Sequence, residues 1–334
     1  MILVTGATGL VGSHLLLQLL EYGQEVRAMY RNVVGLEKTR SLFRSHNRET
    51  LFEKIEWIQA DITDIPSLEK AFPNIDYVYH CAALISFAPN DETLLRKINI
   101  EGTANIVNFC LAYQVKKLCH VSSIAALGDL KEFEDTITED TEWNPEVAHS
   151  DYAISKYGAE MEVWRGLQEG LTVTIINPGI ILGDGFWDSG SGLLFTNVAN
   201  GLSFFTKGSS GFVGVNDVVK SMIQSMESDI SGERFIVIAD NISYQDIVKN
   251  IAVSIKVKAP KRHAKPWMTE IYWRLDALLS FVLNRKRVMS RFMASSLHQT
   301  HQYSNEKIKS ALGFHFQDIE TCIDEIAAYY PHKK

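Results

Sequence analysis

The chain has 334 residues and a mass of 37.6 kDa, enough for about two domains with a large buried core. Hydrophobic residues make up 46% of it, which excludes a chain that is disordered throughout, and the net charge of −7 disfavours a nucleic-acid-binding protein because phosphate contacts need a basic surface. Its four cysteines form no CxxC pair, so neither a disulfide framework nor a structural zinc site is expected.

Short apolar runs alternate with helical patterns in the first half of the chain. Strands are expected at 2–5, 24–30, 55–59, 77–81, 117–122 and 173–177. Helices are expected over 10–22, 93–113 and 152–169, with a short one in the charge-rich stretch before residue 55. The alternation predicts the α/β class, with a Rossmann-type, doubly wound parallel sheet covered by helices on both faces.

The pattern changes after residue 177. Glycine and serine are dense over 183–214, a helix is expected at 217–226, a strand at 234–238, and helices and loops with many basic residues over 241–312. We therefore predict a nucleotide-binding Rossmann domain at 1–176, to which 213–240 returns. The segments 177–212 and 241–334 are expected to form a smaller, mostly helical substrate-binding domain.

Glycines 6, 9 and 12 follow the first strand and open the first helix in the run TGATGLVG. Small residues let the backbone approach a pyrophosphate, and the free N–H groups of a helix N-terminus favour an anion. An ordinary glycine turn is the alternative, which the position directly after a strand at residue 2 disfavours. Residues expected to contact the cofactor here are Gly6, Thr8, Gly9, Leu10 and Gly12.

The residues at the end of the second strand determine whether NAD(H) or NADP(H) is preferred. Tyr30 stands where an acid that binds the ribose of NAD is expected, and Arg31 follows it. A guanidinium suits a 2′-phosphate, so NADP(H) is favoured over NAD(H), although a solvated surface arginine is the alternative. After the third strand, Asp61 could accept a hydrogen bond from an adenine amine, with Ile62 beside it. A turn or helix-capping aspartate remains the alternative for Asp61.

Tyr152 and Lys156 are four residues apart on a predicted helix and therefore share a face. At ~4 Å and an effective dielectric constant of ~20, their electrostatic interaction is about 4 kcal/mol, which lowers the pKa of a phenol by roughly 3 units. Such a phenol is suited to general acid–base catalysis near neutral pH. Ser122 and Ser123 end a strand of the same sheet, where a hydroxyl can bind a substrate carbonyl.

These motifs together resemble the extended short-chain dehydrogenases/reductases, the superfamily of NAD-dependent epimerases and dehydratases, dihydroflavonol reductases and 3β-hydroxysteroid dehydrogenases. Matching segments are TGATGLVGSH (5–14), ADITD (60–64), HCAAL (80–84), NIEGTANIV (99–107), HVSSIAALG (120–128), YAISK (152–156), NPGIILG (177–183), FVGVNDVV (212–219) and YSNEKIKSALGF (303–314). The resemblance implies a catalytic set of Ser123, Tyr152 and Lys156, with Lys156 also on the cofactor ribose. It further implies cofactor contacts at Ser122, Ala82, Ala83, Pro178 and Ile180, and support of the active-site helix by Asn99.

Two departures from the family pattern bear on the class of substrate. Nucleotide-sugar members usually carry an arginine just before the segment that matches FVGVND, where this chain has Ser210, and 179–214 contains Lys207 as its single cation. The same region is rich in aromatic residues, which could line an apolar pocket or be ordinary core. Residues expected at the substrate are Phe87, Ser123, Asn177 and Phe186.

The expected function is NADP(H)-dependent reduction of a carbonyl, or oxidation of the alcohol, in a fairly apolar small molecule. The first alternative is a nucleotide-sugar epimerase or dehydratase with tightly bound NAD(P), and the second is a non-catalytic NADP-sensing protein. The intact serine, tyrosine and lysine disfavour the sensor. The resemblance also implies a homodimer formed by the helices near 93–113 and 152–168.

The remaining expectations concern membranes and metals. The segment 266–287 is amphipathic and ends in Arg285, Lys286 and Arg287, so it either touches a membrane or, as we favour, closes the substrate pocket. No signal-peptide pattern and no run of 18 apolar residues is present, which predicts a cytoplasmic protein with structure from residue 1. His298 and His301 lack an accompanying carboxylate motif, and no metal site is expected.

Overall fold

The computed structural model describes residues 1–283, 287 and 289–331. Its centre is a parallel sheet of seven strands in the order β10-β6-β5-β4-β1-β2-β3. The strands are β1 (Ile2–Thr5), β2 (Val26–Tyr30), β3 (Glu56–Gln59), β4 (Tyr77–His80), β5 (Lys117–Val121), β6 (Val173–Pro178) and β10 (Glu233–Val237). The predicted doubly wound parallel sheet is confirmed. Because β1 pairs with both β2 and β4, the strand order reverses beside β1, which is where such sheets bind their ligands.

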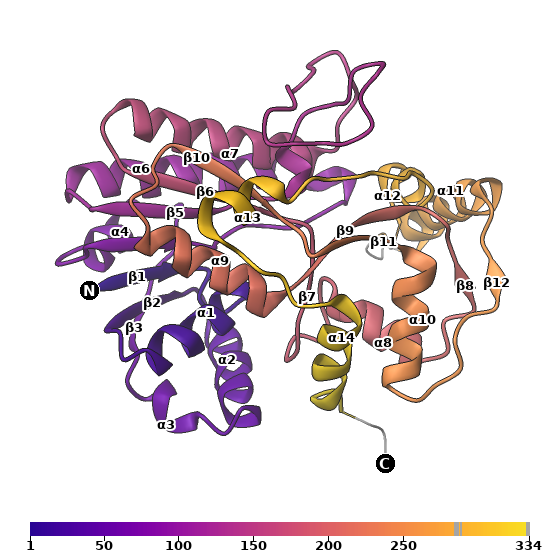
Figure 1. Cartoon of the computed structure of the whole chain (residues 1–334), viewed down its shortest axis with the longest axis horizontal. Helices are drawn as coiled ribbons and strands as arrows, with labels where there is room; N and C mark the ends of the chain where they lie inside the picture. The colour runs from indigo at the N-terminus through magenta and orange to yellow at the C-terminus, as the bar shows by residue number, and fades with distance from the viewer. Residues whose placement is uncertain (284–286, 288, 332–334) are drawn as a thin grey trace.

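Helices cover both faces of this sheet (Figure 1). One face carries α1 (Leu10–Glu21), α2 (Val33–Ser45), α3 (Glu49–Phe52) and α9 (Val215–Glu227), and the other carries α4 (Ile65–Ala71), α6 (Gly102–Ala112) and α7 (Asp151–Gln168). Each face buries its own apolar cluster, so the strands between them are hydrophobic on both sides, as parallel sheets require. Two buried layers hold the strand ends, and therefore the loops that follow them, in fixed positions.

The helix predicted over 93–113 is divided into several segments. A 3-10 turn (Pro89–Asp91) and α5 (Glu92–Leu95) precede a π-helical segment (Arg96–Glu101), and α6 follows. Asn99 lies in the π-helical segment, and its buried side chain bonds to groups outside the helix. Such widened turns often mark functional sites, and the sequence pattern alone did not show this one.

The second part of the chain packs beside the carboxyl ends of the strands. A three-stranded sheet contains β7 (Ile180–Leu182), β9 (Ser209–Gly214) and β11 (Asp240–Ser243), and a two-stranded one contains β8 (Phe204–Phe205) and β12 (Arg262–His263). The helices are α8 (Gly192–Ala199), α10 (Tyr244–Ser254), α11 (Pro266–Val282), α12 (Arg291–Ser296), α13 (Glu306–Leu312) and α14 (Ile319–Ala328), and a further 3-10 turn is at Ile124–Ala126. The expectation of helices and loops alone over 241–312 was wrong at β11 and β12, because such short strands are recognisable only by their distant partners.

The packing of α13 bears on the domain division, which stays a proposal. Ile308 of α13 and the following Phe314 belong to the apolar cluster of α1 and α9, whereas α8, α10 and α14 share a separate cluster. Part of 241–334 therefore packs on the nucleotide-binding sheet.

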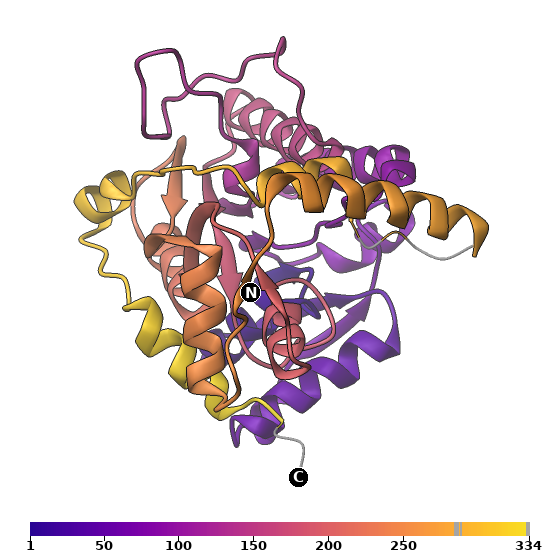
Figure 2. The ribbon, with the colours of Figure 1, turned by 90° about the vertical axis from the view of Figure 1, so that its right-hand side faces the viewer.

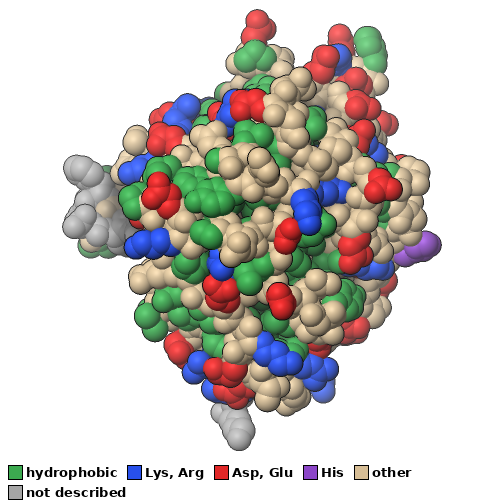
Figure 3. All heavy atoms as spheres, turned by 90° about the vertical axis from the view of Figure 1, so that its left-hand side faces the viewer, with side chains coloured by type: hydrophobic (Ala, Val, Ile, Leu, Met, Phe, Trp, Pro, Cys, Tyr) green, Lys and Arg blue, Asp and Glu red, His purple; other side chains and the backbone are tan. Residues whose placement is uncertain are grey.

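On the face in Figure 3, acidic and basic side chains are interspersed, without a large patch of one sign. Within the described residues, no helix has the length and apolar character needed to cross a membrane.

Candidate functional site

The glycine loop between β1 and α1 is packed too closely for side chains. Gly6 has φ +63°, and a Cβ there would lie 2.5 Å from the backbone nitrogen of Ala82. A Cβ on Gly12 would lie 2.3 Å from the carbonyl oxygen of Gly6, whereas one on Gly9 would meet that oxygen at 3.4 Å. Gly9 caps α1 without any side-chain hydrogen bond, so the first N–H groups of the helix remain open to an anion. Thr8 and Leu10 flank this opening and are half-buried.

Tyr30 and Arg31 lie at the end of β2, beside the N-terminus of α2. Tyr30 is half-buried with its ring edge against Trp57 at 6.2 Å between centroids, and Arg31 is exposed. Across the described parts of the chain, no carboxylate comes within ion-pair distance of the Arg31 guanidinium. A guanidinium without a protein partner is available to a phosphate.

Asp61 serves a local turn in this structure. Its Oδ1 accepts hydrogen bonds from the backbone nitrogen and the hydroxyl of Thr63, at 2.9 and 2.8 Å. Ile62 is buried against the glycine at position 102. The turn role proposed as the alternative for Asp61 is therefore present, and an adenine contact stays a prediction.

A buried hydrogen-bond chain links β1, β4 and the segment after β4. His80 Nε2 lies 3.0 Å from Thr103 Oγ1, which donates to the carbonyl oxygen of Asn99, so Nε2 carries the proton and donates. His80 Nδ1 then accepts from Thr5 Oγ1 at 2.7 Å, and that oxygen accepts from the backbone nitrogen of Ala82. Burial lowers the pKa of His80 to about 3. His80 is therefore a neutral structural residue that positions Ala82.

Tyr152, Lys156 and Ser123 come together where β5 meets α7. Burial raises the pKa of Tyr152, and a hydrogen bond from the Ser123 hydroxyl partly offsets this effect. Lys156 is buried and donates to the carbonyl oxygen of Val121 at 2.8 Å. The sequence predicted that Lys156 lowers the pKa of Tyr152, whereas in the structure this pKa is raised. The Lys156 ammonium is directed to Val121, and desolvation dominates at the phenol. The ring of Phe87 lies 5.5 Å from that of Tyr152.

The burial of Lys156 predicts a pH effect on stability. Desolvation lowers its pKa from 10.5 to about 8, so between these values the unfolded chain holds a proton that the folded protein has lost. Stability from this group therefore rises with pH in that interval. In urea unfolding of the cofactor-free protein, the stability gained by Lys156→Met over the wild type should shrink by about 2–3 kcal/mol between pH 7 and pH 10. Lys54→Met, at an exposed lysine, is the control and should show no such change.

Glu160 is one turn beyond Lys156 on α7 and was missed in the sequence. Its carboxylate is buried and accepts from Asn177 Nδ2 at 2.6 Å and from Arg234 at 3.2 Å. Desolvation raises its pKa, and the neighbouring Ser122 hydroxyl together with Arg234 and Asn177 counteracts this. The spacing Tyr-x-x-x-Lys-x-x-x-Glu, which places all three on one helical face, was the available signal.

Asn177 holds Ser123 in place. It is fully buried, and its Nδ2 donates both to Glu160 and to the carbonyl oxygen of Ser123, at 3.0 Å for the latter. The sequence predicted that Asn177 contacts the substrate. In the structure its amide nitrogen is instead buried and bonded to Ser123 O and Glu160.

The predicted support of α7 by Asn99 is visible in detail. Asn99 Oδ1 accepts from the backbone nitrogen of Leu84 at 2.7 Å, and Nδ2 donates to Leu84 O and to Ser155 Oγ. Ser155 in turn donates to the carbonyl oxygen of Tyr152. The segment that carries Ala82 and Phe87 is thereby tied to the helix that carries Tyr152.

The other predicted site residues lie at strand ends around this centre. Ala82 is half-buried and Ala83 exposed after β4, Pro178 ends β6, and Ile180 begins β7. Phe186 is buried in the loop after β7. The fold therefore brings the loops after β1, β4, β5 and β6 to one edge of the sheet, as expected for this topology.

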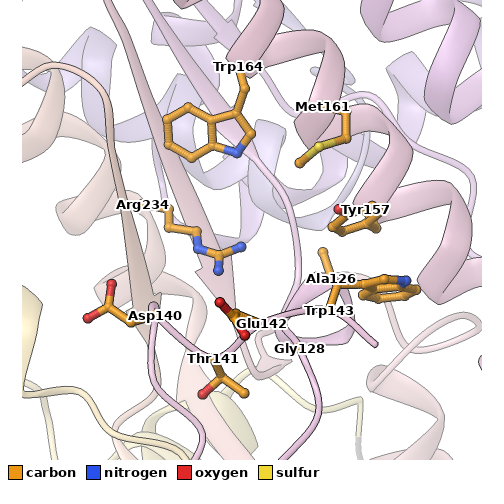
Figure 4. A pocket seen from close by; sticks show the side chains of 10 residues that line it. All are labelled: Ala126, Gly128, Asp140, Thr141, Glu142, Trp143, Tyr157, Met161, Trp164 and Arg234. Carbon is orange, nitrogen blue, oxygen red and sulfur yellow. The ribbon is translucent and has the colours of Figure 1, made fainter. Parts of the chain in front are cut away.

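A pocket of about 460 Å³ lies on a neighbouring face of α7, and Figure 4 shows Arg234 directed into it. Its lining residues are Ala126, Gly128, Asp140, Thr141, Glu142, Trp143, Tyr157, Met161, Trp164 and Arg234. Tyr152 and Lys156 do not line it. Arg234 is shared between this pocket and the buried Glu160, so the two regions are coupled through one ion pair.

A second cluster missed in the sequence joins α1 to the loop after β7. His14 Nε2 and His46 Nε2 lie 3.0 and 2.9 Å from the two oxygens of Asp184, an arrangement whose ligand types could also hold a metal ion. His14 Nδ1 lies 2.9 Å from the carbonyl oxygen of Leu10, so both ring nitrogens of His14 have a protein partner. His298 and His301 bond separately to Thr269 and Gln299.

A seven-stranded parallel sheet with a glycine loop at its switch point, and a serine, tyrosine and lysine at the adjacent strand end, defines an NAD(P)-dependent enzyme of the extended short-chain dehydrogenase/reductase type. The chain belongs to the NAD dependent epimerase/dehydratase family, whose model matches residues 2–239.

Two relatives and one solved structure are similar to this chain. The chain is 29% identical to "Sterol demethylase protein B" of Methylococcus capsulatus over 253 residues, which are 74% of this chain and 72% of the relative. It is 27% identical to a "Putative dihydroflavonol 4-reductase" of Synechocystis sp. over 274 residues, 79% and 75% of the two chains. The fold is similar to that of a UDP-glucose 4-epimerase from Thermus thermophilus in complex with NAD, with a TM-score of 0.75, 21% identity and 98% coverage of both chains.

Proposed function

We propose that this protein transfers hydride between NADP(H) and a fairly apolar carbonyl or alcohol substrate. The observation that carries the proposal is the meeting of Ser123, the Tyr152 phenol and the buried Lys156 at the sheet edge that also bears the glycine loop. This arrangement can bind a carbonyl oxygen and exchange a proton with it.

The residues present fit a dinucleotide. The positions of Gly6 and Gly12 admit no side chain, the start of α1 is open to a pyrophosphate, and Arg31 is without an ion-pair partner among the described residues. Gly6, Thr8, Gly9, Leu10 and Gly12 would hold the pyrophosphate, and Tyr30, Arg31, Asp61 and Ile62 the adenosine end. Ala82, Ala83, Ser122, Lys156, Pro178 and Ile180 would line the nicotinamide end. When bound, the nicotinamide supplies the hydride.

The chain's own residues supply the acid–base part of the reaction. Ser123 donates a hydrogen bond to the substrate oxygen, and the Tyr152 hydroxyl delivers its proton to that oxygen as the alkoxide forms. Lys156 stabilises the resulting phenolate. In this structure Lys156 donates to the carbonyl oxygen of Val121, so a reorientation of its ammonium toward the phenol is part of the proposal.

An apolar substrate is supported by the composition of the site's surroundings. Ser210 stands where nucleotide-sugar members usually have arginine, and it is buried beside Tyr244. Because serine is neutral, this position offers no charge to a diphosphate. Phe87 is 43% exposed beside Tyr152 and can contact a ligand. The names of two relatives, a sterol demethylase protein and a dihydroflavonol reductase, concern apolar ring compounds and favour the same class.

The test is NADPH consumption by the purified protein with lipophilic ketones and aldehydes in parallel with UDP- and dTDP-sugars. We expect alcohol formation in equal amount to the NADPH lost, with products identified by mass spectrometry and NMR. Sugar isomerisation or dehydration without net cofactor loss would show an epimerase or dehydratase instead.

The cofactor preference depends on Arg31. Arg31→Ala removes the guanidinium expected at the 2′-phosphate, where a charge-assisted pair contributes about 1.5–3 kcal/mol, so the KM for NADPH should rise about 10–100-fold. The KM for NADH should change little, because NADH has no such phosphate. Steady-state kinetics with both cofactors measures this, and Arg48→Ala, at a distant exposed arginine, is the matched control. Equal changes for both cofactors would contradict the assignment.

We also propose a homodimer through α6 and α7. The two helices pack against each other, and Met161 and Tyr113 are exposed at their surface or end. Light scattering of the purified protein tests this assembly.

A further inference from the structure

Helix α11 is oriented with its polar side toward the protein. Its residues Thr269, Asp276 and Ser280 are polar or acidic, yet they are only 2–8% exposed. The hydroxyl of Thr269 bonds to His298 Nε2 at 2.8 Å, and Asp276 accepts from the backbone nitrogen of Met289 at 3.1 Å. These bonds fix the rotation of the helix, so its opposite side must face outward.

The outward side is apolar. Its residues are 46–62% exposed and are Trp267, Ile271, Tyr272, Leu275, Leu278, Leu279 and Leu283. They recur at helical spacing and form one continuous stripe, which we call the α11 stripe. Figure 2 shows α11 extending along and beyond one side of the molecule. Soluble proteins rarely expose so many neighbouring large apolar residues without a binding partner.

The charge around the stripe is opposite in sign to that of the whole chain. Between 261 and 291 the described residues include the exposed bases Lys261, Arg262, Lys265, Arg274, Arg287 and Arg291. The same stretch has two acids: Glu270 is paired with Arg274, and Asp276 is buried. The chain as a whole carries a net charge of −7. Arg285 and Lys286, also expected at a membrane, lie outside the described residues.

We propose that the α11 stripe docks on an anionic lipid bilayer, with α11 lying in the interface. Leucine and isoleucine side chains would enter the acyl region, Trp267 and Tyr272 would sit at the headgroup level, and the flanking bases would meet lipid phosphates. A protein partner would need to match both an apolar stripe and its basic border, whereas an anionic bilayer offers both by its composition. This docking is independent of the proposed reaction.

Vesicle sedimentation of the full chain, without substrate or turnover, tests the proposal. We expect binding to phosphatidylcholine vesicles that contain phosphatidylglycerol, much weaker binding to phosphatidylcholine alone, and release at high salt. Leu275→Ser/Leu278→Ser should weaken binding about tenfold or more because it removes buried apolar area. Lys261→Gln/Lys265→Gln should weaken it about fivefold for each charge removed.

Val34→Ser/Val253→Ser, which changes two exposed apolar residues on α2 and α10, is the matched control and should bind like the wild type. Circular dichroism and thermal unfolding check that every variant is folded. The proposal fails if phosphatidylglycerol does not enhance binding, or if the α11 variant binds unchanged. It also fails if Leu275→Ser/Leu278→Ser converts a lipid-free dimer into a monomer, since the stripe is then a contact between copies of this chain.

Discussion

Tyr152→Phe should lower kcat/KM for carbonyl reduction by about 10²–10⁴-fold, or roughly 3–5 kcal/mol of transition-state stabilisation. The variant removes one oxygen, the group that exchanges a proton with the substrate. Ser123, the partner of that oxygen, can still bind the carbonyl, which leaves some residual activity. Single-turnover rates at saturating NADPH measure the chemical step directly.

The control is Tyr157→Phe, on the same helix. Tyr157 is half-buried and stacks on Trp143 at 4.4 Å, on the face of α7 that borders the pocket in Figure 4. Removal of the Tyr157 hydroxyl should leave kcat/KM within a small factor of the wild-type value. The Kd for NADPH should stay the same in both variants. A Tyr152→Phe enzyme that keeps full activity, or cellular function with cofactor binding retained, would contradict the acid–base role and favour a sensor.

Gly12→Ala should destabilise the fold by about 3 kcal/mol or more, at the upper end for overpacking, because the new methyl group meets backbone atoms. Its Cβ would lie 2.3 Å from Gly6 O and 2.8 Å from Ala7 Cα, and neither atom can move without displacing the loop or α1. Denaturant unfolding monitored by tryptophan fluorescence measures the free-energy change.

Gly9→Ala separates folding from binding. A Cβ at Gly9 has ordinary contact with Gly6 O at 3.4 Å, so this variant should fold with nearly normal stability. It should nevertheless bind NADPH at least tenfold more weakly, because the methyl group occupies the space over the α1 N-terminus where the pyrophosphate is expected. If Gly9→Ala binds NADPH normally, the pyrophosphate does not lie over the α1 N-terminus. If Gly12→Ala is as stable as the wild type, the glycine loop is less tightly packed than the contacts of Gly12 indicate.

The local pattern of this chain was sufficient for the parallel sheet and the glycine loop. Strand β1 and helix α1 follow directly from an apolar run, three spaced glycines and a helical repeat, all within the first 21 residues. The Tyr152–Lys156 pair could be placed on one helical face for the same reason, since the spacing of an α-helix is local information. The strand-end position of Ser123 also follows from a short apolar run.

Longer-range features were decided by tertiary contacts. Glu160 becomes part of the site because Asn177, on a strand, and Arg234, from another strand, reach it across the fold. His14, 170 residues before Asp184, meets it only when the second part of the chain packs on α1. Helical periodicity in 93–113 concealed the π-helical turn, which depends on bonds from Asn99 to Leu84 and Ser155.

The sequence by itself determined the class of fold and placed Tyr152 and Lys156 on one helical face, because strands, glycine turns and helical spacing are set by neighbouring residues. Only the tertiary structure decided the direction in which the pKa values of Tyr152 and Lys156 shift, and the orientation of α11. Desolvation by distant segments raises the pKa of Tyr152 and lowers that of Lys156, and bonds from His298 and Met289 turn the polar side of α11 inward. Burial and hydrogen-bond partners depend on residues far apart in the chain, so an amphipathic pattern can identify a helix without indicating which side faces the solvent.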